Sequence, residues 1–268
     1  LNPEQNELLA VGEGGVLYRL DADSGRLKGK IELASAPTGV AVSDSLSRVF
    51  VSRGKIGGFF VLDEIGNVIA AVEEDGIRDA KGIFVDDENH RLFLVHAPYL
   101  QTYELPSLRL LNEENLSIPR EFEATGGSIQ IRPAFDKRRG VIWFPVPGEL
   151  VFDAKWEAHN GGKIYKIDRQ TGARLDSVVF ESKPPGSEFG EIVQTHAPFS
   201  VEIMPDPDKA YVGFDSGVGI LDLNAGEMIG SLDSNLYWSF SANDRIAVDS
   251  TRAILIDGQS RIFDISED

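Results

Sequence analysis

The sequence predicts an all-β fold, a six-bladed β-propeller of four-stranded antiparallel blades. Five times along the chain an apolar strand ends in an acidic residue, a tight turn follows, and another apolar strand begins. The five stretches are Tyr18–Gly25, Val61–Gly66, Tyr103–Ser107, Lys166–Gly172 and Ile220–Gly226. Their acidic residues are 42, 41, 64 and 54 positions apart. A period of roughly 40 residues with about four strands per repeat indicates propeller blades.

The first two repeats define the pattern of strands. Each blade should hold four strands, a to d from the axis outward, with alternating or fully apolar residues. The first repeat supplies Leu8–Val11, Val16–Leu20 and Leu27–Ile31, and the second supplies Gly39–Val42, Arg48–Val51, Phe59–Leu62 and Val68–Val72. The first blade therefore lacks an innermost strand, unless Leu1–Glu7 bends back to form it. Because a ring must close its sheet edges, either this blade has three strands or the C-terminal segment donates one.

The later repeats follow the same order. The third consists of Gly82–Val85, Arg91–Val95, Gln101–Tyr103 and Leu108–Leu111, and the fourth of Ser128–Ile131, Val141–Phe144, Lys163–Ile167 and Asp176–Phe180. The fifth consists of Ser200–Ile203, Ala210–Gly213, Gly219–Leu221 and Met228–Gly230, and the sixth of Tyr237–Phe240, Arg245–Val248, Ala253–Ile256 and Arg261–Ile265. A seventh blade would need more residues than the chain has. Residues 1–268 are therefore expected to form a single propeller domain.

Two segments of the fifth repeat resemble a known family. A YVTN-type propeller repeat is similar to Lys209–Gly213 followed by Gly219–Gly230. The segment Arg48–Ser52 resembles the same repeat. Related NHL and quinoprotein-like propellers have repeats of the same kind. The resemblance extends over nearly the whole chain but is weaker outside these segments. It implies the architecture and leaves the activity open, because such propellers include ligand-binding, scaffolding and catalytic members.

Composition excludes several classes of function. The net charge of −17 disfavours nucleic acid and anionic membranes as partners, but leaves cationic partners, divalent ions and neutral ligands open. Cysteine is absent, which removes disulfides and thiolate sites. No apolar run approaches the ~20 residues of a membrane span. The chain begins at Leu1 rather than Met, which favours a removed leader and a secreted or periplasmic protein, with the cytoplasm as the alternative.

The strand order assigns each connection to one of two ends of the blades. The b–c loops and the connections to the next blade share one end, which we call the top end. The acidic turns lie at the opposite end, and we expect each Asp to cap its own turn. The longest connections, Asn112–Gly127, Pro145–Gly162 and Glu181–Pro198, all fall at the top end around the fourth blade. Connections of such length in a compact domain are often functional.

The top end also collects the candidate site residues. The candidates for acid–base catalysis are His159, His196, Glu149, Asp153 and Glu191. The candidates for ligand binding are Trp156, His96, Tyr99, Arg53 and Arg120. Three imidazoles suit Zn²⁺ or Fe²⁺, but nothing in the sequence brings His96, His159 and His196 together. We therefore expect no metal and no cofactor, with a divalent ion as the alternative.

These observations support one leading function and two alternatives. The leading hypothesis is a non-catalytic propeller that binds a protein or a small ligand through the top-end loops around the fourth blade. The first alternative is an enzyme, a hydrolase, lyase or isomerase that uses His and carboxylate residues at the channel mouth. The second is a repeat module of a larger surface protein. The sequence leaves the choice between enzyme and binding protein open.

Overall fold

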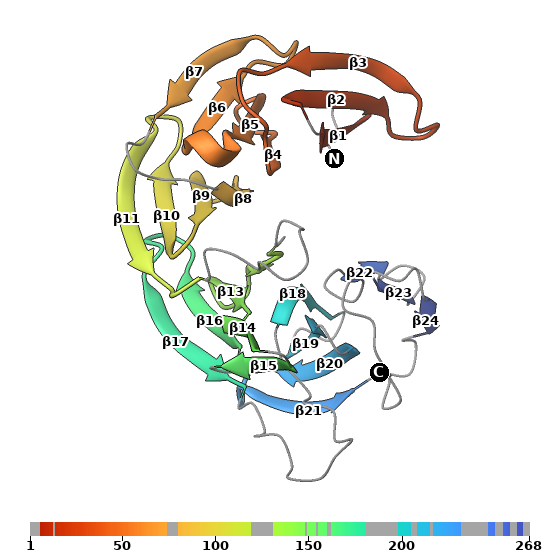
Figure 1. Ribbon diagram of the computed structural model, residues 1–268, viewed down its shortest axis with the longest axis vertical. Coiled ribbons are helices and arrows are strands. Elements are labelled where there is room, and N and C mark those ends of the chain that lie inside the picture. Colours follow the sequence, from red (N-terminus) through yellow and green to blue (C-terminus); the bar gives the residue numbers. More distant parts are fainter. Residues whose placement is uncertain are drawn as a thin grey trace. The chain divides into compact units, whose positions relative to one another are not determined.

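The computed structural model consists almost entirely of β-strands (Figure 1). It describes residues 6–12, 14–73, 80–118, 131–147, 149–153, 155–159, 162–180, 198–204, 208–214, 217–231, 246–249, 254–257 and 262–264. In these ranges the only helix is a short 3-10 turn, η1 (Gly54–Ile56). No helix in the described part of the chain is long and apolar enough to cross a membrane.

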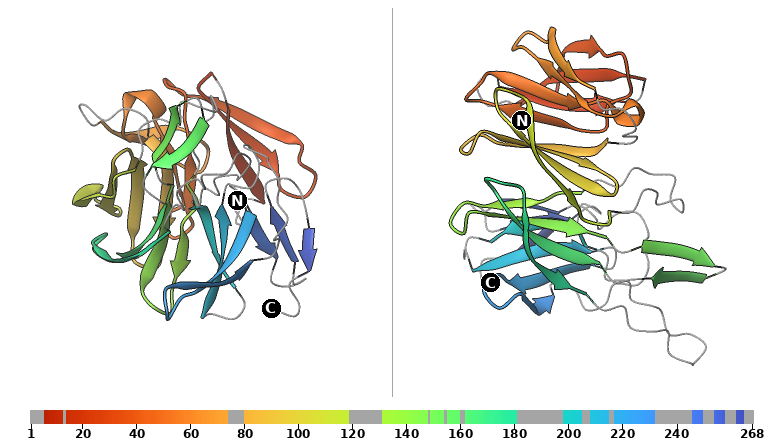
Figure 2. Two further views of the ribbon diagram at one scale, coloured as in Figure 1. Left: turned by 60° about the horizontal axis from the view of Figure 1, so that its bottom comes forward. Right: turned by 90° about the vertical axis from the view of Figure 1, so that its left-hand side faces the viewer.

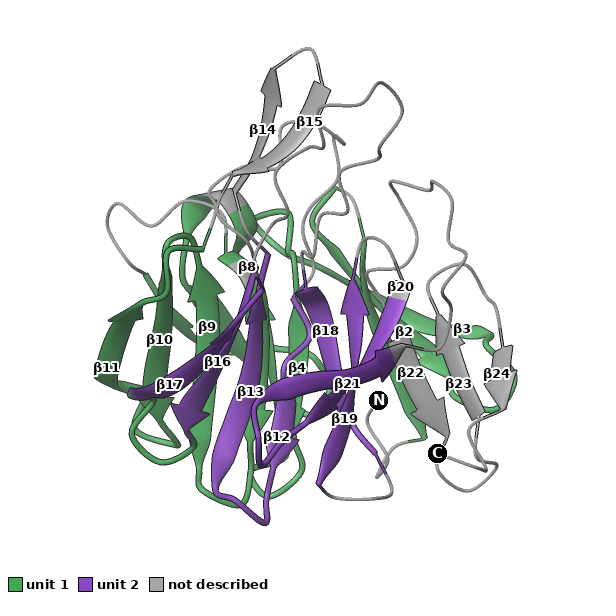
Figure 3. Cartoon of the chain, turned by 90° about the horizontal axis from the view of Figure 1, so that it is seen from below, with its two compact units in different colours: residues 1–120, 169–173 green, residues 121–168, 174–268 purple. Residues whose placement is uncertain are grey.

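The chain divides into two compact units (Figure 3). Unit 1 contains residues 1–120 together with the short turn 169–173, and unit 2 contains residues 121–168 and 174–268. Each unit is described separately below.

Unit 1 holds three antiparallel sheets in its described residues, each with its strands in chain order. The first sheet is β1 (Glu7–Gly12), β2 (Val16–Asp21) and β3 (Leu27–Glu32). The second is β4 (Val40–Ser43), β5 (Arg48–Ser52), β6 (Phe59–Leu62) and β7 (Val68–Val72). The third is β8 (Ala80–Asp86), β9 (Arg91–His96), β10 (Tyr99–Glu104) and β11 (Arg109–Asn115). Every strand predicted for this unit is confirmed, and the first sheet has three strands in its described residues.

Unit 2 repeats the scheme and adds a hairpin. Its first sheet contains β12 (Ala134–Asp136), β13 (Val141–Val146), β16 (Lys163–Asp168) and β17 (Arg174–Val179). The second contains β18 (Pro198–Ile203), β19 (Lys209–Phe214), β20 (Gly217–Asp222) and β21 (Glu227–Ser231). The third contains β22 (Ile246–Asp249), β23 (Ile254–Asp257) and β24 (Ile262–Asp264). Strands β14 (Glu149–Asp153) and β15 (Lys155–His159) form a separate two-stranded sheet (Figure 2). The predicted strand Tyr237–Phe240 lies outside the described residues.

The inner strand of the fourth blade lies later than predicted. Of the predicted segment Ser128–Ile131 only Ile131 is among the described residues, and the strand that pairs with β13 is β12, six residues after Ser128. The reason is the short turn that follows β12, in which the Asp136 carboxylate accepts a hydrogen bond from the backbone N–H of Arg139 at 3.0 Å. Upstream of β12, Arg132 instead forms a parallel bridge with Ser200 of β18.

The acidic turns repeat in structural detail. In each turn the register between the last two strands of the sheet shifts just before the acid, as between Arg19 and Leu20 or between Val61 and Leu62. The carboxylates of Asp21, Asp63 and Asp222 accept backbone N–H groups of their own turns at 2.8–3.1 Å, as predicted. The left-handed position of these turns is glycine except in the third sheet, where Leu108 has φ 58°. The turn of the third sheet therefore adopts the same left-handed conformation without glycine, the residue that adopts it at no steric cost.

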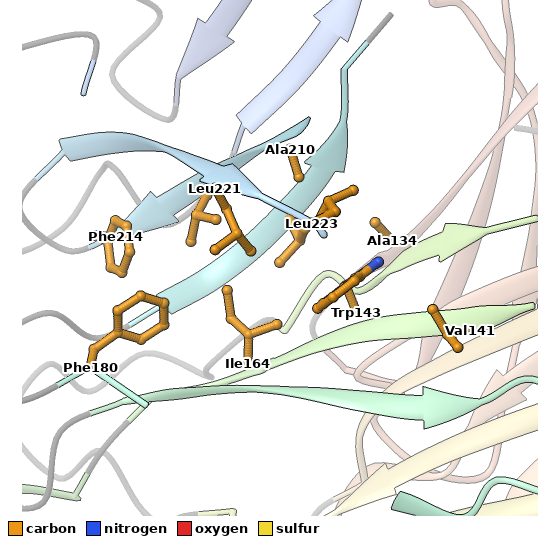
Figure 4. Packing of buried hydrophobic residues seen from close by; sticks show 11 residues of the cluster. Ala134, Val141, Trp143, Ile164, Phe180, Ala210, Phe214, Leu221 and Leu223 are labelled. Carbon is orange, nitrogen blue, oxygen red and sulfur yellow. The ribbon is translucent and has the colours of Figure 1, made fainter. Parts of the chain in front are cut away.

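Burial follows the predicted order of strands within a blade. The second and third strands of the sheets are largely buried, as in β5, β6, β9 and β13, whereas the fourth strands β3, β7, β11 and β17 are mostly exposed. In unit 2 the core lies between neighbouring sheets, where Trp143 and Ile164 of one sheet belong to the same buried cluster as Ala210 and Leu221 of the next (Figure 4). The first two sheets of unit 2 therefore bury the faces that they turn toward each other.

Candidate functional site

Three of the candidate ligand-binding residues lie at the top end of unit 1. Arg53 follows the end of β5, His96 ends β9 and Tyr99 begins β10. Because neighbouring strands run antiparallel, these positions all lie at one end of their sheets. The hydroxyl of Thr38 joins the second and third sheets at this end by donating a hydrogen bond to the carbonyl of Ala80.

His96 is the most enclosed of these residues. It was expected in a loop, exposed or hydrogen-bonded, but it is the last residue of β9 and only 2% exposed. Its ring centroid lies 5.5 Å from that of Tyr99, and its Nε2 lies 3.9 Å from the nearer carboxylate oxygen of Glu113. That nitrogen has no hydrogen-bond partner among the described residues. Burial lowers the pKa of His96, and the charge of Glu113 opposes that shift only in part.

A chain of hydrogen bonds runs from the core to Glu113. The Tyr103 hydroxyl donates to Oε1 of Gln101 at 2.9 Å, and Nε2 of Gln101 donates to Oε2 of Glu113 at 2.9 Å. The register explains this, because Tyr99, Gln101 and Tyr103 alternate along β10, and Tyr99 pairs with His96 on β9. The result is one polar row on a sheet face that is otherwise apolar.

The enclosure of His96 predicts a stability that depends on pH. The folded imidazole binds a proton less readily than the unfolded one, so the unfolded state takes up more protons as the pH falls below about 6.5. The free energy of unfolding should therefore decrease between pH 7.5 and 5.5, and His96→Gln should reduce that dependence. Urea unfolding at each pH measures it. The control is His90→Asn, at an exposed turn residue with φ 53°, and an equal effect of both variants would contradict the assignment.

Arg53 already has partners. Its Nη1 lies 3.0 Å from the Glu73 carboxylate, and its guanidinium carbon lies 5.1 Å from the ring centroid of Phe60. A guanidinium over an aromatic face and beside a carboxylate is stabilised in place. These two contacts therefore hold Arg53 against the second sheet.

The candidates of the fourth blade lie on the separate hairpin. The segment Pro145–Gly162 was expected to be a loop, but most of it forms β14 and β15. The backbone register places Glu149 directly opposite His159, and Asp153 opposite Lys155. The same register places Phe152 opposite Trp156. His196, Glu191 and Arg120 lie outside the described residues.

Sequence reasoning did not single out Glu202. This acid lies on β18, where Val201 belongs to the core cluster of unit 2 and Glu202 points to the other side of the strand. Burial raises the pKa of Glu202, and the charge of Arg132 partly lowers it. Its neighbour Ser200 has a buried hydroxyl with no hydrogen-bond partner in the described part. An acid in the middle of a predicted inner strand was the signal that could have found it.

Two further observations limit the chemistry of the described residues. In those residues no group of three or more His, Asp or Glu side chains is placed to hold a metal ion. Asp86 and Arg169 are buried charges of unit 1 at the end opposite His96, where Asp86 ends β8 and Arg169 begins the segment 169–173. They form an ion pair, with Arg169 Nε and Nη2 each 2.6 Å from a carboxylate oxygen of Asp86.

Comparison with solved structures decides the fold. No known protein family matches the chain, and no curated protein is similar to it in sequence. Hydrazine synthase from Kuenenia stuttgartiensis is similar in structure, with a TM-score of 0.69 and 14% identity over 100% of this chain and 76% of that chain. BamB from Moraxella catarrhalis has a TM-score of 0.62 and 15% identity over 94% of this chain and 66% of that chain. Both are β-propeller proteins.

The chain has a β-propeller fold. The predicted fold class is thereby confirmed, and the sheets of units 1 and 2 are its blades. The number of six blades and the membership of a YVTN or NHL family stay predictions. At 14% and 15% identity the two similarities concern the fold and carry no activity with them.

Proposed function

We propose that this propeller is a non-catalytic protein-binding module that uses the β14–β15 hairpin as its main contact. The proposal rests on one observation: the hairpin is a two-stranded sheet outside the blade that contains β13 and β16. An isolated two-stranded hairpin is at best marginally stable in water, and packing against another surface stabilises it. A partner protein would supply such a surface.

The register of the hairpin divides its residues into two sets. Leu150 lies opposite Ala158 and Phe152 opposite Trp156, so these four apolar residues occupy one set of paired positions. The other set contains mostly charged residues: Glu149, Asp153, Lys155, Glu157 and His159, together with Val151. Alternation of this kind is typical of a strand pair with one face toward a contact and one toward water. Aromatic residues such as Trp156 are also frequent centres of binding energy at protein interfaces.

The charge of the chain favours a particular kind of partner. With a net charge of −17, the propeller attracts basic proteins and repels acidic ones over long distances. We propose a partner with an apolar groove bordered by Lys or Arg residues.

Substitution within the hairpin tests this function. Proteins that bind the wild-type chain are captured from an extract of its native host and purified, and their affinities are measured by biolayer interferometry. Trp156→Ala should weaken binding by about 2 kcal/mol or more, roughly a 30-fold increase in Kd, because it removes a central aromatic contact. His159→Asn is the matched control on the same strand, in the charged set. It should change Kd less than about threefold, well under 1 kcal/mol.

The same pair of variants separates binding from catalysis. The enzyme alternative retains Glu149 and His159, which the register places opposite each other, as an acid–base pair. It requires that His159→Asn abolish activity while Trp156→Ala spares it. Loss of binding with His159→Asn but not with Trp156→Ala would contradict the proposed function.

A further inference from the structure

Strand β7 is the outer edge of the second sheet and has an unpaired side. One side of β7 pairs with β6, from Phe59 opposite Val72 to Leu62 opposite Val68. No strand in the described residues pairs with the other side. An edge strand presents a row of backbone N–H and C=O groups that an additional strand can pair with. In Figure 1, β7 lies on the outer rim of unit 1, as do β3 and β11.

The composition of β7 differs from that of every other outer strand in the described part of the chain. Its sequence is VIAAV, with no charged or polar residue. The other outer strands all carry charges, namely Lys28, Lys30 and Glu32 on β3, Arg109, Glu113 and Glu114 on β11, Arg174 and Asp176 on β17, Glu227 on β21 and Asp264 on β24. Charged side chains, Lys above all, are the usual means by which proteins prevent unwanted pairing at an edge. Strand β7 lacks this protection.

The apolar residues of β7 are both exposed and firmly held. Val68 is 48% exposed and Ile69 is 50% exposed. Ala70 and Val72 pack against the core cluster shared with the third sheet, and the neighbouring strand β6 is fully buried. The edge is therefore rigid before any partner binds, which reduces the entropy lost on binding.

Acidic residues stand at both ends of this apolar strand. Asp63 and Glu64 precede it in the β6–β7 turn, and Glu73, which also pairs with Arg53, follows it directly. The sequence continues with Glu74 and Asp75. A strand that adds to this edge would find an apolar centre between two negative ends. That pattern suits an extended segment with β-branched residues in its middle and Lys or Arg at its ends.

We propose that β7 is a docking edge for an extended segment of a partner protein, which adds as a fifth strand to the second sheet. The backbone of β7 supplies hydrogen bonds, and Val68, Ile69 and Ala71 supply apolar contacts, as in other cases of strand addition. The partner is a different protein rather than a second copy, because two chains of charge −17 repel each other. This site is separate from the β14–β15 hairpin and does not depend on the function proposed for it.

A synthetic peptide tests the docking edge in the intact protein. The probe is acetyl-Lys-Lys-Val-Thr-Val-Thr-Val-Lys-Lys-amide with a fluorescent label, and binding is followed by anisotropy. The wild-type protein should bind it, and hydrogen exchange should slow at the amides of residues 68–72. Ile69→Lys should raise Kd at least tenfold, because a charged lysine side chain on the edge strand disfavours pairing with another strand. The matched control is Leu27→Lys on β3, where the native residue is 59% exposed and Lys28 already protects the edge; it should leave Kd within twofold.

Three controls make the proposal falsifiable. A peptide with Pro in place of both Thr residues keeps the charge but lacks two N–H donors, so equal binding of that peptide would mean simple charge attraction and overturn the proposal. Slow exchange without peptide at the amides of β7 that point away from β6 would mean that the edge is already covered, which also overturns the proposal. Sedimentation that shows a dimer dispersed by Ile69→Lys would identify a second copy as the occupant and contradict the proposed partner. Circular dichroism confirms that each variant is folded.

Discussion

Replacing Arg169 by alanine should lower the free energy of unfolding by about 3–5 kcal/mol, because the substitution leaves the buried carboxylate of Asp86 without its counter-charge. Arg169 is 3% exposed and Asp86 is 4% exposed. The pair is bidentate at 2.6 Å, and Glu88 adds a third contact to Arg169 at 3.1 Å. Unfolding in urea, followed by tryptophan fluorescence, measures the loss.

The double variant shows whether the cost arises from the isolated charge. Asp86→Asn with Arg169→Met removes both charges, so it should be markedly less destabilised than the sum of the single variants. Arg109→Ala, at an exposed ion pair with Glu104, is the control and should have a much smaller effect. If the single and double variants prove additive, the ion pair is not the source of the stability.

Acid should weaken this interaction in a defined direction. Burial alone would raise the pKa of Asp86, but the hydrogen bonds from Arg169 and Asn89 and the charge of Arg169 outweigh burial and lower it. A lowered folded pKa gives stability that is present above the unfolded value of about 4 and is lost as the pH falls through the folded value. The difference between wild type and Arg169→Ala should therefore shrink below about pH 4.

The second large effect is expected from Phe59→Ala, which should cost about 3–5 kcal/mol of unfolding free energy. Phe59 is 0% exposed, and its ring centroid lies 5.2 Å from that of Tyr103 and 6.2 Å from that of Phe50. Removing the ring leaves a cavity between the second and third sheets and removes an edge-to-face contact. The same urea titration gives the size of the loss.

Two further substitutions bracket this result. Phe59→Leu fills part of the cavity and should restore a large share of the stability. Ile65→Ala changes a residue that is 72% exposed in the β6–β7 turn and should stay within about 0.5 kcal/mol of wild type. A small effect of Phe59→Ala would show that the interface between these sheets contributes little to the fold.

Local patterns predicted most of the strands. Strands β6 and β7 have the expected bounds because their apolar runs stand between turn residues such as Gly58 and Asn67. The inner strand of the fourth blade was misplaced because Ile129 and Ile131 alternate convincingly, while the acid that closes the turn, Asp136, comes later. The β14–β15 hairpin was missed because its charged residues suggested a loop.

The sites were harder to predict, since they depend on contacts between distant residues. Arg169 and Asp86 are far apart in the sequence, and no local spacing signals their pairing. The burial of His96 depends on the sheet continuing one residue beyond the apolar run that ends at Val95. The hydrogen bond that Glu113 accepts from Gln101 became apparent only from the register of β10 and β11, which places the two residues opposite each other.

The join between β13 and β16 has a practical consequence for protein engineering. Val146 pairs directly with Lys163, although the whole β14–β15 hairpin lies between them in the chain. The two strands therefore meet in register at the base of the connecting segment. Each doubling of that segment costs only ~0.6 kcal/mol of closure entropy. This position should accept a grafted epitope or an inserted guest domain, so that the propeller would serve as a rigid display scaffold.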